Sequence, residues 1–254
     1  MSYVEDLFSL TGKTAVVTGA GRGLGRAISE ALGQAGAKLL LVGRDGECLA
    51  QAKAELATLG VDAEERTCDL SRRDDVDGLI EFIRTELGEL HVLVNNAGIS
   101  RSQPLLEYDD AAWDETLSVN LDAPFRLARG LAPLMPEGGS IINITSIGAE
   151  LAGGNPAYGA AKGGLKQLTK VLAHGLAVHG IRVNAIGPGY FLTDLGGSSG
   201  KDADQLEQLA AKTMLGRLGQ PKDLAGLAIV LASDASGYVT GQDFYVDGGW
   251  SAKL

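Results

Sequence analysis

Tyr158 and Lys162 lie four residues apart, and Ser146 lies twelve residues before Tyr158. On a helix, residues four apart lie on the same face. A phenol beside an ammonium ionises more easily, because the positive charge favours the phenolate. Such a Tyr can exchange a proton near neutral pH, and a nearby Ser hydroxyl can hold the reacting oxygen. A Tyr-x-x-x-Lys also arises by chance in a chain with six Tyr, so the surrounding elements must support the interpretation.

The composition excludes several classes of protein. The 254 residues are 45% hydrophobic, enough for one large core and a single domain, and the net charge is −10. A nucleic-acid binder needs a basic face, and a membrane protein needs an apolar run of about 18 residues. The sequence shows neither, and two scattered Cys (Cys48, Cys68) and three scattered His (His91, His174, His179) predict no metal site and no disulfide framework. We expect a cytoplasmic enzyme or binding protein with a small-molecule ligand.

Short apolar runs alternate with helical patterns along the whole chain. Predicted strands are Lys13–Thr18, Lys38–Gly43, Val61–Thr67, His91–Asn95, Ser140–Thr145, Ile181–Ile186 and Asp243–Val246. Predicted helices are Gly25–Ala35, Cys48–Leu59, Asp74–Leu87, Ala111–Leu134 with a kink at Pro124, Tyr158–His179 and Asp223–Ala232. Near-continuous apolar strands separated by helices predict an α/β fold: one Rossmann-type, doubly wound parallel sheet with helices on both faces, spanning 1–254. Ligands bind such sheets at the carboxyl ends of the strands.

A glycine-rich loop follows the first predicted strand. Residues 18–25 read Thr-Gly-Ala-Gly-Arg-Gly-Leu-Gly, a T-G-x-x-x-G-x-G pattern between a strand and a helix. Glycines there permit a tight turn and let the backbone approach a pyrophosphate at a helix N-terminus. The loop therefore predicts a dinucleotide cofactor.

With these motifs, nearly the whole chain resembles the classical short-chain dehydrogenase/reductase family. The resemblance rests on the glycine loop, Asn95-Asn96-Ala97-Gly98 after the fourth strand, Asn120, Ser146, the Tyr158–Lys162 pair, Pro188-Gly189 with Thr193, and Asp69. It implies hydride transfer between a nicotinamide and an alcohol or ketone carbon. It also implies the catalytic residues Asn120, Ser146, Tyr158 and Lys162, in which Tyr158 exchanges the proton, Lys162 lowers the pKa of Tyr158 and holds the nicotinamide ribose, Ser146 binds the reacting oxygen, and Asn120 fixes a relay water. The implied cofactor-binding residues are Thr18, Gly19, Gly21, Arg22, Gly23, Leu24, Gly25, Arg44, Asp69, Leu70, Asn96, Ala97, Gly98, Tyr158, Lys162, Pro188, Gly189, Phe191 and Thr193.

The spacing from Ser146 to Tyr158 is one residue shorter than the family's usual thirteen. Thr145 has the usual spacing, but Ser146 stands at the expected strand end. We favour Ser146 and keep Thr145 as the alternative.

The end of the second predicted strand decides between NADP and NAD. A carboxylate there binds the ribose hydroxyls of NAD, whereas an Arg binds the 2′-phosphate of NADP. Gly43 stands where NAD-preferring relatives carry an acid, and Arg44 follows it. Arg22 adds a second cation, so the sequence favours NADP(H) over NAD(H).

Substrate signals are weaker. Three segments resemble gluconate 5-dehydrogenases and 2-dehydro-3-deoxygluconate 5-dehydrogenases: 98–101, 146–151 and 187–193. They suggest Arg101, Glu150 and Tyr190 as substrate residues, with Arg101 able to pair with a sugar-acid carboxylate. Residues 192–215, which contain Gly196, Gly197 and Gly200, are the expected flexible lid.

Three functions remain open at this stage. The first is an NADP(H)-dependent oxidoreductase acting on a sugar acid, a polyol or a small ketone. The second is a 3-oxoacyl-[acyl-carrier-protein] reductase, for which Arg126 and Arg129 are the available basic pair. The third is a non-catalytic NAD(P)-sensing protein on the same fold. The family also implies a homotetramer or homodimer joined through the long helix that begins at Tyr158, where small residues would permit close packing.

Overall fold

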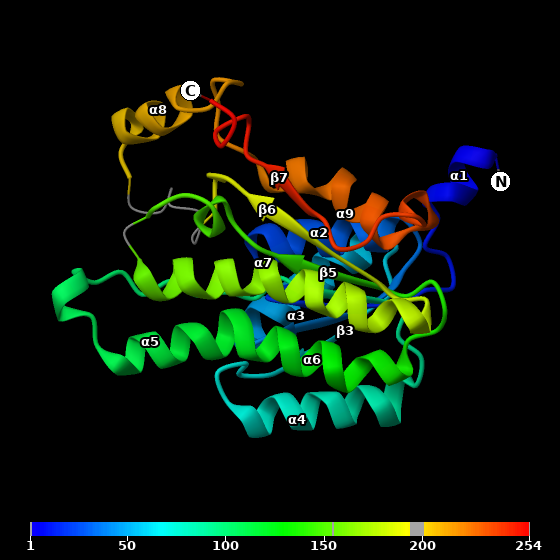
Figure 1. Cartoon of the computed structure of the whole chain (residues 1–254). Coiled ribbons are helices and arrows are strands. Elements are labelled where there is room, and N and C mark those ends of the chain that lie inside the picture. The colour runs from blue at the N-terminus through cyan, green and yellow to red at the C-terminus, as the bar shows by residue number, and fades with distance from the viewer. Residues whose placement is uncertain (1, 154, 194–200, 254) are drawn as a thin grey trace.

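In the computed structural model, which describes residues 2–153, 155–193 and 201–253, the strands of those residues form one seven-stranded parallel sheet (Figure 1). They are β1 (Thr14–Thr18), β2 (Lys38–Gly43), β3 (Ala63–Thr67), β4 (Val92–Asn95), β5 (Ser140–Ile144), β6 (Arg182–Pro188) and β7 (Asp243–Val246). Their order is β3-β2-β1-β4-β5-β6-β7. The chain order changes direction between β1 and β4, which is where such sheets open a ligand crevice. The predicted doubly wound α/β fold is confirmed.

Helices cover both faces of the sheet because every central strand is apolar on both sides. On β1, Ala15 and Val17 belong to the core beneath α2 (Gly23–Gln34), α3 (Gly46–Thr58) and α9 (Ala225–Ala232). Val16, between them, belongs to the opposite core beneath α4 (Arg73–Phe82), α6 (Ala123–Leu131) and α7 (Pro156–Leu176). Successive strand residues point to opposite faces, so a continuous apolar run supplies both cores.

The predicted helix Ala111–Leu134 is interrupted, but not at Pro124 itself. It divides into α5 (Asp110–Leu117), a π-helical turn (η3, Ser118–Asp122), α6 and a 3₁₀ turn (η4, Ala132–Leu134). Pro124 occupies the first turn of α6, where its missing N–H is tolerated. The irregular turn just before it contains Asn120.

Two helices lie outside the sequence-based prediction. Helix α1 (Tyr3–Phe8) begins with a Ser2 capping box and buries none of its residues. Helix α8 (Ala203–Ala211) lies within the segment expected to be a lid. Of that segment, residues 194–200 lie outside the described residues. The remaining short turns are η1 (Ile83–Leu87, π-helical), η2 (Leu105–Glu107), η5 (Ile147–Ala149), η6 (Ala177–His179), η7 (Pro221–Leu224) and η8 (Asp234–Ser236).

Candidate active site

Helix α7 begins at the site, and Asn155 fixes its first turn. The Asn155 Oδ1 accepts a hydrogen bond from the Tyr158 backbone N at 3.0 Å and another from the Tyr108 hydroxyl at 3.1 Å. Its Nδ2 donates to the Ser100 Oγ at 2.8 Å and to the Arg101 carbonyl at 2.9 Å. One side chain therefore caps α7 and ties it to the loop that follows β4.

Lys162 lies one turn further along α7 and is 3% exposed. Its Nζ donates to the carbonyl of Ile144, at the end of β5, over 2.6 Å, and lies 5.7 Å from the centre of the Tyr158 ring. The helix thus places both predicted side chains against the carboxyl end of β5.

Burial controls the pKa values of this pair. It raises the pKa of Tyr158, and a hydrogen bond with Ser146 opposes that rise. Burial also lowers the pKa of Lys162 to about 8. Sequence analysis expected Lys162 to lower the pKa of Tyr158. In the structure burial is the dominant influence on that pKa, and the Lys162 ammonium is directed toward the Ile144 carbonyl.

Ser146, and not Thr145, is the hydroxyl that the structure brings to Tyr158. Ser146 hydrogen-bonds with Tyr158, and its Oγ accepts from the Gly148 backbone N at 3.0 Å, which begins the turn η5. Thr145 is 1% exposed and donates instead to the Asp243 Oδ1 on β7, at 2.8 Å. The shorter spacing thus still leaves a Ser beside the Tyr.

Asn120 is fully buried, and its amide is already used. The Oδ1 accepts from the Ile99 backbone N at 3.1 Å, while the Nδ2 donates to the carbonyls of Ile99 and Thr116 at 2.8 and 3.0 Å. Pro124 has no N–H, so the main-chain carbonyl of Asn120 receives no α-helical hydrogen bond from the residue four positions on. The side chain therefore positions the loop after β4.

The glycine loop is interlocked with the loop after β4. The Thr18 Oγ1 donates to the Val94 carbonyl at 3.2 Å and accepts from the backbone N atoms of Asn96 and Ala97, both at 3.0 Å. The Asn96 Nδ2 in turn donates to the carbonyls of Thr18 and Gly19 at 2.8 and 3.2 Å. Thr18 and Asn96 therefore shape the loop with side chains that face protein.

Two glycines of this loop have no room for a side chain. A Cβ at Gly25 would lie 2.2 Å from the Gly19 carbonyl oxygen and 2.4 Å from the Asn96 Nδ2. At Gly19, where φ is +66°, a Cβ would lie 2.8 Å from that Nδ2. Beyond the loop, the Thr193 Cγ2 lies 3.5 Å from the position of a Cβ on Gly23. Side-chain-free backbone at the N-terminus of α2 fits the pyrophosphate of a dinucleotide, and Thr193 lies beside it.

Charged side chains surround the end of β2. Arg44 is 62% exposed, and its Nη1 lies 3.9 Å from the Oε1 of Glu115 on α5. Burial acts to raise the pKa of Asp69, but hydrogen bonds from Ser71 and the charge of Arg44 lower it overall. Arg22 precedes α2. Hydrogen bonds from Cys48 lower the pKa of Asp45 most, and the nearby charge of Arg22 lowers it further. The predicted cofactor cations therefore lie on one rim, together with carboxylates.

The other predicted cofactor residues contribute backbone or packing. Leu70 is 8% exposed and Phe191 is 2% exposed, so both side chains belong to the core. Leu24 packs against the core beneath α2. A Cβ at Gly189 would lie 2.7 Å from the Cα of Asp247, which brings the loop after β6 against the end of β7.

Comparisons with known proteins agree with this architecture. A family profile described as "Enoyl-(Acyl carrier protein) reductase" matches residues 19–251. Gluconate 5-dehydrogenase of Gluconobacter oxydans is 38% identical over 252 residues, 98% of each chain. The 2-dehydro-3-deoxy-D-gluconate 5-dehydrogenase of Formosa agariphila is 39% identical over 98% of this chain and 96% of that protein. A crystal structure of a gluconate 5-dehydrogenase from Burkholderia cenocepacia, in complex with NADP and tartrate, has a TM-score of 0.92 at 35% identity and covers 99% of this chain and 100% of that one. The chain belongs to the short-chain dehydrogenase/reductase family. It is an oxidoreductase that acts on hydroxyl or keto groups, as sequence analysis predicted.

The three predicted substrate residues of this short-chain dehydrogenase/reductase are engaged within the protein. Arg101 forms a two-pronged ion pair with Glu115, with both N–O distances at 3.0 Å. Glu150 pairs with Lys166, one turn beyond Lys162 on α7, and its Oε1 lies 3.0 Å from the Tyr245 hydroxyl.

Tyr190 contacts an aromatic ring that sequence analysis missed. Its ring centre lies 4.6 Å from that of Trp250. Trp250 gave no signal in the sequence because it lies outside every family motif and meets Tyr190 only through the fold. Glu115 was missed for the same reason, since no spacing links it to Arg44 or Arg101.

The part of the expected lid that follows α8 is packed against the residues after β7. The Leu215 backbone N donates to the Gly248 carbonyl at 3.1 Å, and the Lys253 Nζ donates to the Ala211 carbonyl at 2.8 Å. The Lys212 Nζ lies 5.5 Å from the centre of the Trp250 ring. Helix α8 and the residues after β7 accordingly lie at the same end of the molecule (Figure 1).

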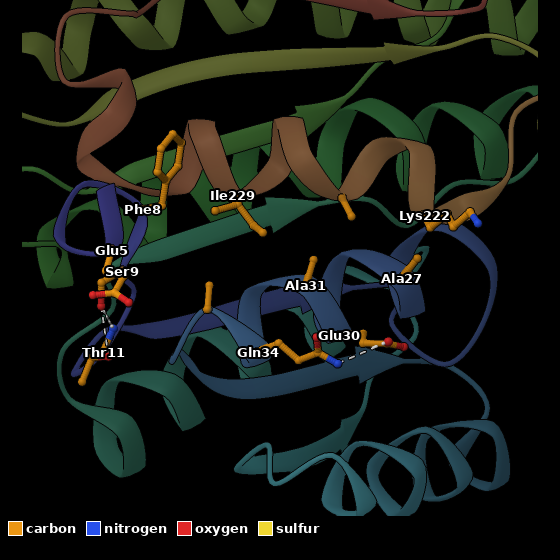
Figure 2. A pocket seen from close by; sticks show the side chains of 12 residues that line it. Glu5, Phe8, Ser9, Thr11, Ala27, Glu30, Ala31, Gln34, Lys222 and Ile229 are labelled. Atoms are coloured by element: carbon orange, nitrogen blue, oxygen red, sulfur yellow. Dashed lines mark hydrogen bonds between the residues drawn. The ribbon is translucent and has the colours of Figure 1, made fainter. Parts of the chain in front are cut away.

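A separate groove of about 750 Å³ lies between α1, α2 and α9 (Figure 2). Its wall is largely apolar, with Phe8, Ala31 and Ile229, and Glu5 and Glu30 lie at its edge. None of the predicted site residues lines it. Within the described ranges, no helix combines the length and the apolar character that a membrane crossing requires. Those same residues bring no three His, Cys, Asp or Glu side chains together as a metal site.

Proposed function

We propose that this enzyme interconverts a secondary alcohol group and a keto group, with NADP(H) as cofactor and Tyr158 as general acid/base. The substrate is a sugar acid, a polyol or a small ketone. The observation that carries the proposal is the meeting of Tyr158, Ser146 and Lys162 at the end of β5, beside a glycine loop shaped for a dinucleotide. When bound, the nicotinamide supplies or accepts the hydride.

Tyr158 exchanges the proton at the substrate oxygen. In ketone reduction it donates its hydroxyl proton to the carbonyl oxygen, and in alcohol oxidation its phenolate accepts the hydroxyl proton. The raised pKa of Tyr158 keeps the phenol protonated, which suits the reductive direction. Ser146 donates a hydrogen bond to the same oxygen and stabilises the charge that develops on it.

Lys162 and Asn120 supply the route by which Tyr158 exchanges its proton with solvent. The Lys162 ammonium, with a pKa of about 8, can give up and regain a proton near neutral pH. The main-chain carbonyl of Asn120 binds a water between Lys162 and solvent, since its amide is committed to Ile99 and Thr116. Lys162 also holds the nicotinamide ribose.

NADP(H) is favoured over NAD(H) at the rim after β2. Gly43 places no carboxylate there, and the neighbouring guanidinium of Arg44 is exposed enough to meet a 2′-phosphate. The Burkholderia cenocepacia enzyme and a gluconate 5-dehydrogenase from Beutenbergia cavernae, 38% identical to this chain, both have NADP in their crystal structures.

The preference for sugar acids, polyols or small ketones rests on the relatives. Relatives from several bacteria bear the names gluconate 5-dehydrogenase and 5-keto-D-gluconate 5-reductase.

Reduction of an acyl-carrier-protein substrate has less support. An Escherichia coli reductase of that kind is 37% identical over 94% of this chain. However, Arg126 of the candidate basic pair is 18% exposed and lies 3.8 Å from Asp77. Arg129 lies over the ring of Phe125 instead.

We further propose a homotetramer or homodimer in the cytoplasm, joined through α7. Val171 on this helix is 57% exposed, and Gly175 has open space around it. Light scattering on wild type and on Val171→Glu tests this: the variant should have a lower mass, and a monomeric wild type would contradict the proposal.

The decisive experiment measures NADPH or NADP turnover against ketones, polyols and aldonates. Tyr158→Phe should lower kcat by about 100-fold or more, because it removes the acid/base group. Tyr238→Phe is the matched control, since Tyr238 is fully exposed and should leave the rate unchanged. Turnover by Tyr158→Phe at the wild-type rate would contradict the mechanism.

A further inference from the structure

Glu115 lies between two arginines that follow different strands. Its carboxylate accepts from the Arg101 Nε and Nη2, both at 3.0 Å, and its Oε1 lies 3.9 Å from the Arg44 Nη1. Arg101 follows β4 and Arg44 follows β2. One carboxylate on α5 therefore joins the loop beside the substrate to the rim of the cofactor site.

We propose that Glu115 is a specificity-determining residue: as the shared counter-ion of Arg44 and Arg101, it weakens the attraction of Arg44 for a 2′-phosphate and keeps Arg101 from binding a substrate carboxylate. The proposal rests on the proposed function in one respect, that Arg44 faces the 2′-phosphate of NADP. It deepens that function, because it says which charge of substrate the site accepts.

The ion pair of Glu115 with Arg101 is stronger than its ion pair with Arg44, and this difference decides which arginine stays with Glu115. A planar guanidinium that meets a carboxylate through two short hydrogen bonds is held firmly. Arg101 and Glu115 have that geometry, and Glu115 is 29% exposed. The single 3.9 Å approach of Arg44, whose side chain is 62% exposed, is weaker. Arg44 can therefore turn to a phosphate while Glu115 stays with Arg101.

Glu115 then remains as a negative charge beside the phosphate site. Asp69 adds to it, because its carboxyl is also close enough to interact with Arg44. Like charges near an incoming dianion oppose its binding, whereas NAD(H) has no 2′-phosphate and does not meet this repulsion. The carboxylate therefore narrows the preference for NADP(H) that Arg44 provides.

The same pair acts on the substrate side. A carboxylate that approached Arg101 would find the Nε and Nη2 hydrogens that face Glu115 already bound, and it could reach the other N–H groups only beside the negative charge of Glu115. A neutral polyol or ketone faces no such competition. The chain therefore favours neutral substrates over aldonates at Arg101.

Glu115→Gln tests both consequences in the oxidative direction, with oxidised NADP and oxidised NAD as cofactors and an aldonate and a matched neutral polyol as substrates. The cofactor ratio, which is kcat/KM with NADP divided by kcat/KM with NAD, should rise about two- to fivefold, the range expected for a surface ion pair. KM for the aldonate should fall relative to KM for the polyol. Asp114→Asn is the matched control, because it removes the same charge from an exposed neighbour on α5 that makes no ion pair among the described residues.

Arg101→Gln should move the cofactor ratio the other way, since Glu115 is then free to hold Arg44. The inference would be overturned if Glu115→Gln changed the cofactor ratio no more than Asp114→Asn does. It would also be overturned if Arg101→Gln changed the ratio in the same direction as Glu115→Gln. Arg44→Ala separates the proposed function from the inference about Glu115. If Arg44→Ala leaves the cofactor ratio unchanged, the proposed role of Arg44 fails. If Arg44→Ala lowers the ratio but Glu115→Gln has no effect, only the inference about Glu115 is refuted.

Discussion

Removal of one buried hydroxyl, in Thr18→Val, should loosen the joint between the glycine loop and the loop after β4. Thr18 is 1% exposed, so the change of shape is small and the loss is one of hydrogen bonds. The Asn96 N–H keeps the Val94 carbonyl as a partner at 3.1 Å, whereas the Ala97 N–H has only the Thr18 Oγ1 among the described residues.

The magnitude follows from that difference. A buried donor left without a partner costs about 1–3 kcal/mol, and the remaining hydrogen bonds of the hydroxyl add about 1 kcal/mol. We therefore expect the free energy of unfolding to fall by about 2–4 kcal/mol. With a urea m-value of about 3 kcal/mol/M, the denaturation midpoint should move down by about 1 M.

NADPH affinity, read from nicotinamide fluorescence, should fall with stability because the displaced loop must be restored on binding. Each 1.4 kcal/mol of that cost raises Kd about tenfold. Thr18→Ser keeps the hydroxyl and is the control, and it should remain close to wild type in Kd. A Val variant with wild-type stability and affinity, or a Ser variant as impaired as Val, would refute the reasoning.

Three further changes test other parts of the site. Lys162→Met removes a group whose pKa falls from 10.5 to about 8 on folding. Between these values the unfolded chain binds more protons than the folded one, so the cost of burying Lys162, about 3 kcal/mol below pH 8, diminishes as pH rises. Urea denaturation should therefore show that the Met variant, compared with wild type, is relatively less stable at pH 10 than at pH 7. Gly25→Ala should lower the thermal midpoint and weaken NADPH binding by about 1–3 kcal/mol, because its methyl group would lie 2.2 Å from the Gly19 oxygen, whereas Gly78→Ala, in open space on α4, should stabilise by about 0.5–1 kcal/mol. Asn155→Ala should cost about 1–2 kcal/mol of stability through loss of the α7 cap, and Asn155→Asp, which keeps the cap but loses the ties to Ser100 and Arg101, should lower kcat with a smaller loss of stability.

Each of these expectations can fail on its own. A stability difference between Lys162→Met and wild type that does not change from pH 7 to pH 10 would show that the lysine keeps an ordinary pKa. Equal midpoints for Gly25→Ala and wild type would mean that the loop yields without cost. If Asn155→Asp retains full kcat, the ties to the loop after β4 are not needed for positioning Tyr158.

Local sequence was enough to predict most of the sheet and to place Tyr158 and Lys162 one turn apart on a single helix. Strands such as β2 and β7 were predicted to the residue, because an apolar run between turn residues has little choice of conformation. Tyr158 and Lys162 were found because helical periodicity fixes their relation. Helix α1 was missed because it buries no residue, so no apolar stripe marks it.

Partners that meet only through the fold could not be predicted. Arg101, Glu150 and Tyr190 were proposed because they stand in segments that resemble gluconate 5-dehydrogenases, and each has a protein partner 14 or more residues away in the sequence. Burial raises the pKa of Tyr158, and burial is a property of the packed site that the Tyr-x-x-x-Lys spacing does not show.

The contrast between the two halves of the cofactor site bears on how such enzymes diverge. A Cβ on Gly25 would lie 2.4 Å from the Asn96 Nδ2, so almost any substitution of Gly25 would disturb the packing of the loop whatever its effect on catalysis. Arg44 and Glu115 lie on the surface, where replacements cost little stability. With the proposed roles of Arg44 and Glu115, the preferred dinucleotide could change through a few replacements at the rim with little loss of stability, while the packing of the glycine loop stays fixed.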